Sequence, residues 1–229
     1  MSAYDSFTKH YISVDNIIFG FAQGELKVLL IKRNFEPHQG KWSLMGGFVR
    51  QGENLQDAAA RVVLTLTGLA DVFMEQVKTY GAIDRDDEDR TISVAYYALI
   101  RVDQYDAALG EGHGAKWFPI EALPKLIFDH AQMIQDALKV LQEKTRQKPI
   151  GFNLLPLKFT IPQLRLLYEV INQKQLDHGN FSKKLHNMQL LERLDDKDKS
   201  QSKKGAYYYR FDPLRYRALE TEGLNFDLK

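Results

Sequence analysis

The segment from Gly47 to Leu69 holds a spacing of residues that could take part in phosphate chemistry. It places a carboxylate at Glu53 and a guanidinium at Arg61, between glycines at Gly47 and Gly68. Hard cations such as Mg²⁺ need oxygen ligands, chiefly carboxylates, and a bound cation can bridge and polarise pyrophosphate oxygens during hydrolysis. One carboxylate cannot hold a catalytic cation cluster, so the other positions of the segment decide whether hydrolysis is possible.

The segment reads GFVRQGENLQDAAARVVLTLTGL, and this pattern resembles the Nudix box, G-x5-E-x7-R-E-U-x-E-E-x-G-U, in which U is a bulky aliphatic residue. The matching positions are Gly47, Glu53, Arg61, Val63, Gly68 and Leu69. The lead-in from Trp42 to Gly47 is also similar, although Met45 stands where a proline is common. The resemblance covers roughly residues 10–145 and implies a Nudix fold.

The departures from the box predict that the domain does not catalyse hydrolysis. Val62, Thr65 and Leu66 occupy the three positions where the box requires further carboxylates. Valine and leucine cannot ligate a cation, and a threonine hydroxyl is a poor substitute. We therefore expect no catalytic residue, no metal and no cofactor. The expected helix also carries an apolar stripe, formed by Leu55, Ala58, Ala59, Val62, Val63 and Leu66.

A Nudix frame without metal ligands suggests a domain that senses a small molecule in the groove beside the box helix. The candidate effector-binding residues are Lys32, Arg33, Trp42, Asp84, Arg85, Arg90 and His130. Trp42 could stack on a sugar ring and the charged groups could bind hydroxyls. The alternatives are solvated strand ends, a plain hairpin turn from Asp84 to Arg90, and a His130 that lies near a helix start capped by Asp129.

The C-terminal region reads as helix, turn, helix and hairpin, the order of a winged helix. Thr160 is the expected cap of the first helix, with Pro162 in its first turn. Asp177 or Asn180 caps the second helix. A polar second helix can enter the major groove, and a basic wing can contact phosphates. The candidate DNA-binding residues are Asn180, Ser182, Lys183, Lys184, His186, Asn187, Lys203, Lys204 and Arg210.

The elements that position these residues follow from the hydrophobic pattern. Two strands join at a Gln23-Gly24 turn. Later strands run through 77–83, 91–102 and 117–119, and helices through 55–66 and 129–144. In the C-terminal region, strands at 190–194 and 206–211 flank a polar loop. The predicted fold class is an α/β (α+β) Nudix sandwich, residues 1–148, followed by a winged helix-turn-helix domain, residues 149–229. The boundary is placed at Lys148-Pro149.

Composition supports two parts with different tasks. Residues 1–150 carry 17 Lys/Arg and 20 Asp/Glu, and residues 151–229 carry 14 and 10, so an acidic part precedes a basic part. No cysteine is present, which excludes disulfides and thiolate metal sites. No apolar run is long enough to span a bilayer, and residues 1–9 lack a signal-peptide pattern. We therefore expect a cytoplasmic protein without a membrane partner.

Both parts together resemble the Nudix-related transcriptional regulators, which join a Nudix-like domain to a winged helix. The similar positions are Phe128-Asp129-His130, Asp177, Asn180-Phe181, Lys183-Lys184 and Leu185. The resemblance implies a homodimer on a double-stranded, palindromic DNA operator, and usually a repressor that a small-molecule effector releases. Some members respond to ADP-ribose and others control pentose use. The chain looks closer to the arabinose-responsive regulators, so we expect a regulator of sugar catabolism whose effector is a pentose such as L-arabinose.

The sequence lacks an obvious phosphate-binding glycine nest, which also favours an uncharged sugar over ADP-ribose. Within this family, a regulator of NAD metabolism that senses ADP-ribose remains the alternative. Two functions from other classes also remain. One is a Nudix hydrolase with unorthodox metal ligands. The other is a Nudix-fold scaffold that binds a protein partner, in which case the C-terminal region is an interaction or dimerisation module.

Overall fold

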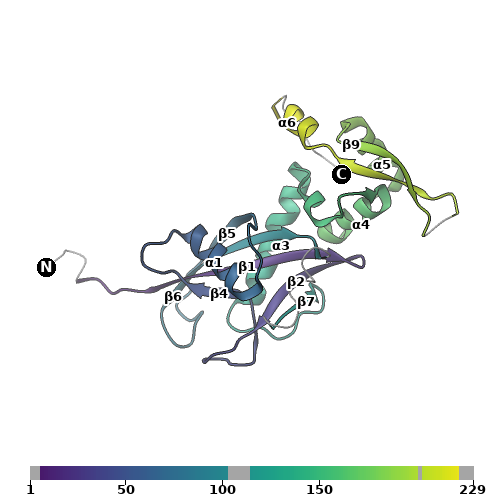
Figure 1. Cartoon of the computed structure of the whole chain (residues 1–229). Helices are drawn as coiled ribbons and strands as arrows, with labels where there is room; N and C mark the ends of the chain where they lie inside the picture. The colour runs from purple at the N-terminus through teal and green to yellow at the C-terminus, as the bar shows by residue number, and fades with distance from the viewer. Residues whose placement is uncertain (1–5, 103–113, 201–202, 222–229) are drawn as a thin grey trace. The chain divides into compact units, whose positions relative to one another are not determined.

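The computed structural model describes residues 6–102, 114–200 and 203–221 (Figure 1). These residues form two compact units. The first contains the chain up to Phe19, Lys27–Leu99 and the described part of Gln104–Ala137. The second contains Gly20–Leu26, the described part of Ile100–Asp103, and the described residues from Leu138 onward. The division falls inside helix α3, His130–Gln147, whereas the expected boundary at Lys148-Pro149 follows the end of that helix.

Most of the first unit is built around strands β1, Tyr11–Ala22, and β2, Glu25–Lys32, which form a hairpin whose turn end belongs to the second unit. The turn between them is Gln23-Gly24, as expected, and both residues have positive φ. That conformation is the one that a two-residue hairpin turn needs. Strand β1 has eight consecutive buried residues instead of an alternating pattern, because it lies in the middle of a sheet that is covered on both faces.

Among the described residues, seven strands form the sheet of this unit. The main order is β3, Trp42–Ser43; β2; β1; β6, Thr91–Ile100; and β5, Met74–Tyr80. Strand β4, Met45–Phe48, pairs antiparallel with β1 and brings Gly46 opposite Asp15. Strand β7, Ala115–Pro119, pairs antiparallel with β2. The sheet thus gathers the ends of several strands beside the box segment.

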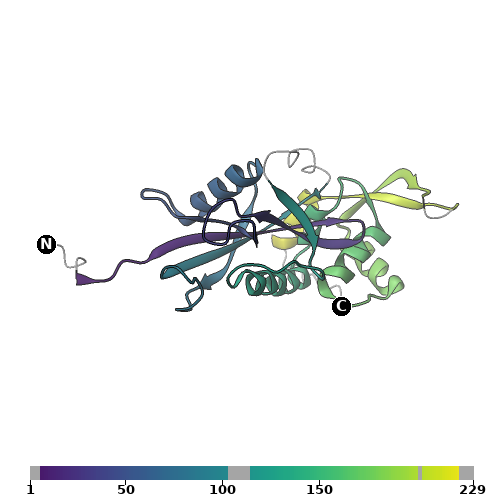
Figure 2. The same ribbon diagram turned by 90° about the horizontal axis from the view of Figure 1, so that it is seen from below.

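Helices α1, Leu55–Thr67, and α3 lie on opposite sides of this sheet (Figure 2). The expected apolar stripe of α1 is largely buried, with Ala58, Ala59, Val62 and Val63 in the core. Five apolar residues of α3 are also buried in the core: Met133, Ile134, Ala137, Leu138 and Leu141. Helix α1 ends at Gly68, whose left-handed conformation lets its N–H bond the Leu64 carbonyl.

The second unit contains the expected helix, turn, helix and hairpin. After a short 3-10 helix, η2 (Ile150–Leu154), come β8 (Phe159–Thr160), α4 (Ile161–Asn172), α5 (His178–Met188), β9 (Leu191–Asp198), β10 (Ala206–Phe211) and α6 (Pro213–Thr221). Strands β8, β10 and β9 form a sheet in that order. Strand β9 runs four residues beyond the expected strand end at Leu194, because an exposed hairpin strand needs no apolar alternation. The sequence did not predict α6.

The caps of the two helices are those that the sequence indicates. The Thr160 hydroxyl accepts a hydrogen bond from the Gln163 N–H, and the Gln163 side chain accepts one from the Thr160 N–H, which makes a complete capping box. The Asp177 carboxylate accepts a hydrogen bond from the Asn180 N–H, so Asp177 is the cap of α5. No helix in the described ranges is both long and apolar enough to cross a membrane.

Candidate functional site

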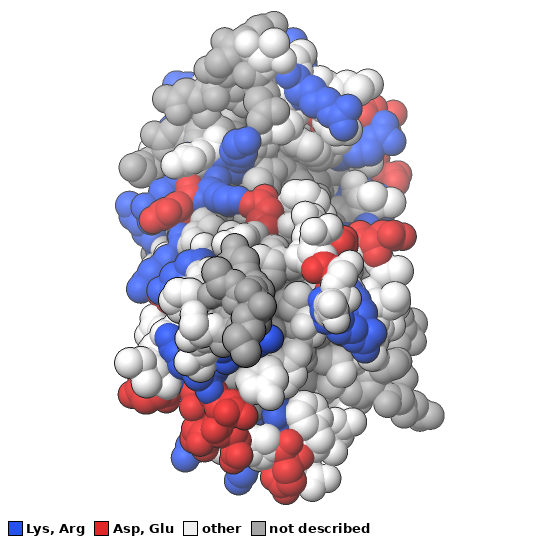
Figure 3. Space-filling view, turned by 90° about the vertical axis from the view of Figure 1, so that its left-hand side faces the viewer, with Lys and Arg blue, Asp and Glu red and all other residues white. Residues whose placement is uncertain are grey.

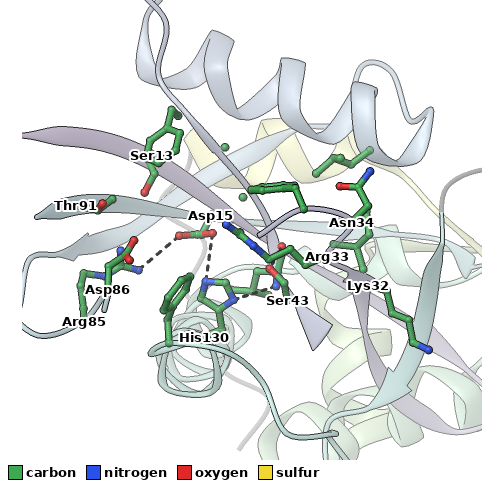
Figure 4. Close-up of a pocket in the computed structure, with 18 residues that line it drawn as sticks. Ser13, Asp15, Lys32, Arg33, Asn34, Ser43, Arg85, Asp86, Thr91 and His130 are labelled. Atoms are coloured by element: carbon green, nitrogen blue, oxygen red, sulfur yellow. Dashed lines mark hydrogen bonds and ion pairs between the residues drawn. The ribbon is translucent and has the colours of Figure 1, made fainter. Parts of the chain in front are cut away.

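A pocket in the first unit opens beside the box segment (Figure 4). Its wall is made by β1, the end of β2, β3, β4, the first residues of β6 and α3, one residue of α1, and the loop residues 33–35, 44, 85–86 and 128. The cavity volume is about 120 Å³. Its polar lining residues are Ser13, Asp15, Lys32, Arg33, Asn34, Ser43, Arg85, Asp86, Thr91 and His130.

The floor of the pocket holds a buried ion-pair group. The Arg85 guanidinium donates to both carboxylate oxygens of Asp129, at 2.8 and 3.1 Å, and lies 3.7 Å from the Asp15 carboxylate. The side chain of Arg85 is only 3% exposed, and that of Asp15 only 6%. Buried charges are tolerated only when they are paired in this way. Asp129, expected as a possible helix cap, instead uses its carboxylate to hold Arg85.

His130 is also buried in the floor, and its hydrogen bonds fix its protonation. Its Nδ1 accepts a hydrogen bond from the Leu44 N–H at 3.1 Å, and its Nε2 lies 3.5 Å from an Asp15 oxygen. Burial lowers the pKa of His130, and the nearby Asp15 and Asp129 carboxylates only partly oppose this effect. The imidazole is therefore neutral near pH 7, with its proton on Nε2 facing Asp15.

The side chains of Lys32 and Arg33, two further cations in the pocket lining, point in different directions. Lys32 is directed away from the floor (Figure 4), and its ammonium group lies 5.4 Å from the centre of the Trp42 ring. Arg33 donates from Nε to the Pro37 carbonyl, and its guanidinium carbon lies 3.9 Å from the centre of the exposed Phe35 ring. Partial burial lowers the pKa of Arg33, although the group stays a cation near pH 7.

The structure brings four of the seven candidate effector residues to the pocket lining: Lys32, Arg33, Arg85 and His130. The other three lie outside the lining. Trp42 packs edge-on against Phe118. Asp84 is exposed, and Arg90 donates to the Ala82 carbonyl.

Sequence reasoning missed Asp15, which lies at the centre of the floor. The signal was present, because Asp15 and Asn16 interrupt an apolar strand at Val14 and Ile17–Phe19. A charged residue inside a buried strand needs a partner, so it marks a site or an ion pair. The partners Ser93 and His130 lie far along the chain, and only the folded structure brings them together.

The box residues that survive form an ion pair with each other. Arg61 donates to both oxygens of Glu53, at 2.6 and 2.9 Å. The Arg50 N–H also donates to Glu53. Mainly through the bonds from Arg61, these donors lower the pKa of the Glu53 carboxyl to about 2. The carboxylate is thus committed to a structural contact.

The residues at the carboxylate positions of the box do not fit a divalent cation. Val62 is buried and packs so closely on Gly47 that a Cβ there would lie 2.7 Å from Val62 Cγ2. Thr65 is exposed, and Leu66 turns an apolar side chain into the pocket lining. Over the part of the chain that the structure describes, no three His, Asp or Glu side chains gather as metal ligands. The Mg²⁺ that the Nudix fold implies therefore has no suitable ligand set here.

The second candidate site is the outward face of α5. Phe181 and Leu185 are buried, which leaves the other side of the helix to solvent. Of the candidate DNA-binding residues on α5, Asn180, Lys183, His186 and Asn187 are exposed, while Ser182 and Lys184 are half-buried. The N-terminus of α5 is capped by Asp177, and residues 177–180 are exposed. A helix with such a face can present polar side chains to the major groove.

The remaining candidate DNA-binding residues lie in the β9–β10 hairpin, two in its turn and one in strand β10. Lys203 and Lys204 are exposed in the turn. Arg210 is further down β10, where it donates from Nε and Nη2 to the Glu192 carboxylate of β9 at 3.2 and 2.7 Å. Tyr209 of the same strand touches α5, because its ring meets the His186 ring edge-on. The wing is thus in contact with the outward face of α5.

Charge on the surface is not of one sign everywhere. The face in Figure 3 shows basic and acidic side chains intermixed, with acidic side chains gathered at its lower edge. A mixed face of this kind gives no strong attraction to a polyanion. The basic excess of residues 151–229 is therefore the more relevant feature for a nucleic-acid partner.

Two protein families match this chain in the order of its two parts. The NUDIX domain matches residues 9–137, and the family described as "NrtR DNA-binding winged helix domain" matches residues 151–211. The chain is 33% identical to the "ADPR responsive transcriptional repressor NtrR" of Acinetobacter baylyi over 219 residues. This aligned region covers 94% of this chain and 85% of the relative. It is also 34% identical over 131 residues to an ADP-ribose pyrophosphatase of Methanocaldococcus jannaschii, covering 56% and 73%.

Solved structures agree with these matches. Shewanella oneidensis NrtR complexed with a 27mer DNA has a TM-score of 0.79 at 27% identity, over 90% of this chain and 95% of that one. The NUDIX domain of the same protein complexed with ADP ribose has a TM-score of 0.51 at 29% identity, over 60% and 92%. The expected order of a Nudix fold followed by a winged helix is therefore confirmed.

Proposed function

We propose that this chain, which belongs to the family of NrtR-type regulators that join a Nudix domain to a winged helix, is a DNA-binding transcriptional repressor with ADP-ribose as its effector. The observation that carries the proposal is the similarity to an ADPR-responsive repressor through both domains. The site geometry supports the same division of tasks. The Nudix unit has a pocket lined by several charged side chains, whose described residues offer no set of metal ligands, and the second unit has an exposed polar helix beside a wing.

The sequence-based preference for L-arabinose as effector is not supported, because the similar regulators are named or crystallised with ADP-ribose. The preference depended on the absence of a glycine nest for phosphates. A nest is one way to hold a pyrophosphate, and cationic side chains are another. Arg33 lines the pocket, and its Nε donates to the Pro37 carbonyl. The two Nη atoms of the same guanidinium can donate to a ligand. It is the group that we assign to the pyrophosphate.

We expect the Nudix domain to bind ADP-ribose without hydrolysing it. Hydrolysis at this fold needs a cation cluster, and the positions that would supply its ligands carry Val62, Thr65 and Leu66. The similarity to an ADP-ribose pyrophosphatase keeps hydrolysis as a second candidate function. It predicts Mg²⁺-dependent formation of AMP and ribose 5-phosphate.

The pocket is too small to enclose a whole nucleotide sugar. Its cavity volume of about 120 Å³ is below the ~300–1,000 Å³ of typical ligand sites. We therefore expect one end of ADP-ribose to enter the cavity, and the rest to lie along its opening.

On the DNA side, we propose that α5 enters the major groove. Lys183, Asn180 and Asn187 are exposed on its outward face, and amide and ammonium groups of this kind can bind base edges and phosphates. The exposed Lys203 and Lys204 of the wing turn are assigned to phosphate contacts. A homodimer on a palindromic operator remains a prediction.

Release from the operator requires ADP-ribose to bind the DNA-free arrangement more tightly than the DNA-bound one. A ligand shifts an equilibrium only by its differential affinity for the two states. By linkage, operator DNA must then weaken ADP-ribose binding by the same factor. This reciprocity can be checked by titrating ADP-ribose in the presence and absence of DNA.

The test is an electrophoretic mobility shift with the full chain and DNA from upstream of its own gene cluster. Parallel lanes contain ADP-ribose, L-arabinose or no ligand, and the ADP-ribose is recovered afterwards and analysed for AMP. We expect a shift that intact ADP-ribose abolishes and that L-arabinose leaves in place.

Each other result has a definite meaning. A shift abolished only by L-arabinose would overturn the effector assignment. Recovery of AMP in step with protein concentration and Mg²⁺ would favour the hydrolase. If the chain shifts no DNA even at low salt, the regulator proposal fails and the scaffold alternative gains support.

A further inference from the structure

The pocket floor has a feature that the box positions do not explain. Asp15 lies in the middle of β1, its side chain is 6% exposed, and it still lines the pocket. In Figure 4 it lies among the pocket-lining side chains, with dashed lines to Arg85 and His130. These neighbours and Ser93 offset the cost of burying Asp15, and its place in the lining leaves it open to a ligand group.

Asp15 is held in place by groups that leave part of it available. The Ser93 hydroxyl donates to one carboxylate oxygen at 2.5 Å. His130 Nε2 lies 3.5 Å from the other oxygen, and Arg85 lies 3.7 Å away, beyond the distance of a direct hydrogen bond. A carboxylate can accept about four hydrogen bonds. The framework therefore orients Asp15 while leaving acceptor positions for a ligand.

The groups around Asp15 decide which ligand groups the floor can accept. Two carboxylates, Asp15 and Asp129, share the single guanidinium of Arg85, and His130 is neutral. Arg33 also lines the pocket, and its cation interacts with Asp15, so the carboxylates and cations around Asp15 roughly balance. Asp15 itself accepts hydrogen bonds and attracts donors. Of the parts of ADP-ribose, the ribose hydroxyls are such donors, whereas the pyrophosphate is not.

The approach to Asp15 is kept free by a glycine. Gly46 pairs with Asp15 across β4 and β1, and a Cβ at Gly46 would collide with the Asp15 carboxylate. Gly46 and Gly47 also line the pocket. The backbone therefore comes close to the carboxylate without a side chain that would cover it.

We propose that Asp15 accepts hydrogen bonds from the vicinal hydroxyls of a ribose that enters the pocket. Asp15 is then the specificity-determining residue for effectors with a free ribose diol, and Arg33 of the same lining faces the pyrophosphate. The inference is built on the proposed function, because it requires a nucleotide sugar as effector.

The test compares ligands first, since this needs no variant. The full-length chain is titrated calorimetrically with ADP-ribose and with two analogues. One analogue lacks the 2-hydroxyl group of the adenosine ribose. The other analogue lacks the 2-hydroxyl group of the terminal ribose. We expect one analogue to bind roughly ten- to a hundredfold more weakly, the range for a lost hydrogen bond to a charged group.

The protein side of the test uses Asp15→Asn, which keeps the size of the side chain and removes its charge. We expect the variant to bind ADP-ribose and the weaker analogue equally. The matched control is Asp87→Asn, because Asp87 is exposed, lies outside the pocket lining and should leave the discrimination intact. A thermal melt and the operator shift show whether each variant is folded.

The outcomes separate this inference from the proposed function. If the wild-type chain binds all three ligands alike, the role of Asp15 is overturned and the effector stands. If Asp15→Asn discriminates as the wild type does, the role is again overturned. If the wild-type chain binds no ADP-ribose, both the effector and the role of Asp15 fail.

Discussion

The pocket floor and the outward face of α5 use polar residues in opposite ways. In the floor, Asp15, Arg85 and Asp129 are held by one another, and Arg85 is almost fully buried. On α5, Asn180, Lys183 and Asn187 are exposed, and the buried side of the helix is provided by Phe181 and Leu185. Fold stability and ligand binding therefore depend on the same residues in the floor, whereas they are separate on α5.

This difference fits the partners that we propose for the two surfaces. A small molecule needs a preorganised site, so the polar groups of its pocket are fixed before it arrives. A DNA-binding face must remain open and hydrated, and it gains affinity by releasing counterions. Substitutions should consequently change stability strongly in the floor, and change only binding on α5.

The largest effect is expected for Arg85→Ala. It leaves Asp15 and Asp129 buried without their cation, and breaking a buried ion pair in this way typically destabilises a protein by about 3–5 kcal/mol. Denaturant unfolding of the variant and the wild type measures the difference. The matched control is Arg90→Ala, since Arg90 is less buried and donates only to a backbone carbonyl. Equal stability of Arg85→Ala and wild type would mean that the floor is not a structural element.

The second prediction concerns α5. Lys183→Ala should weaken operator binding and lower the slope of log K against log salt by about one, the value for one phosphate contact. Adding Lys184→Ala should extend the loss. Because Lys183 is exposed, the free energy of unfolding should stay the same. Lys125→Ala, at an exposed position of the first unit, is the control. A variant that loses stability and keeps its salt slope would contradict the comparison.

The third prediction uses pH. Burial lowers the pKa of His130 in the folded chain, so below about pH 6.5 the unfolded chain binds a proton that the folded chain does not. Stability should therefore fall as the pH drops below 6.5, by at most about 1.4 kcal/mol per pH unit for this group.

His130→Gln should flatten that part of the stability profile, whereas His10→Gln, at an exposed position, should leave it unchanged. Chemical unfolding at several pH values between 5 and 7 measures both. An identical profile for His130→Gln and wild type would show that His130 does not carry the dependence.

The fold could be read from the sequence because its signals are local. The capping box of Thr160 and Gln163, the Asp177 cap and the Gln23-Gly24 turn each lie within four residues of chain. The hydrophobic pattern of α3 likewise needs no partner to be recognised. Strand ends were less predictable, as β9 shows, because exposed hairpin strands carry no hydrophobic period.

The pocket could not be read in the same way, because its members come from distant parts of the chain. Asp15 meets Ser93 78 residues later, and Leu44 meets His130 86 residues later. Trp42 was a reasonable candidate by type, but its ring packs on Phe118 instead of lining the pocket. The residue type alone does not say on which side of a strand a side chain lies.

The smallest effect is expected for Arg210, which tests whether an exposed ion pair behaves like the floor. Its pair with Glu192 bridges β10 and β9, and both side chains are more than half exposed. Surface pairs contribute about 0–1 kcal/mol, so Arg210→Ala should barely change the free energy of unfolding. Because Glu192 already offsets its charge, the variant should also lose less operator affinity than Lys183→Ala. Glu192→Gln is the sharper test: it frees the guanidinium, so operator binding should strengthen and its salt slope steepen if Arg210 faces DNA. An unchanged affinity would place Arg210 outside the DNA interface.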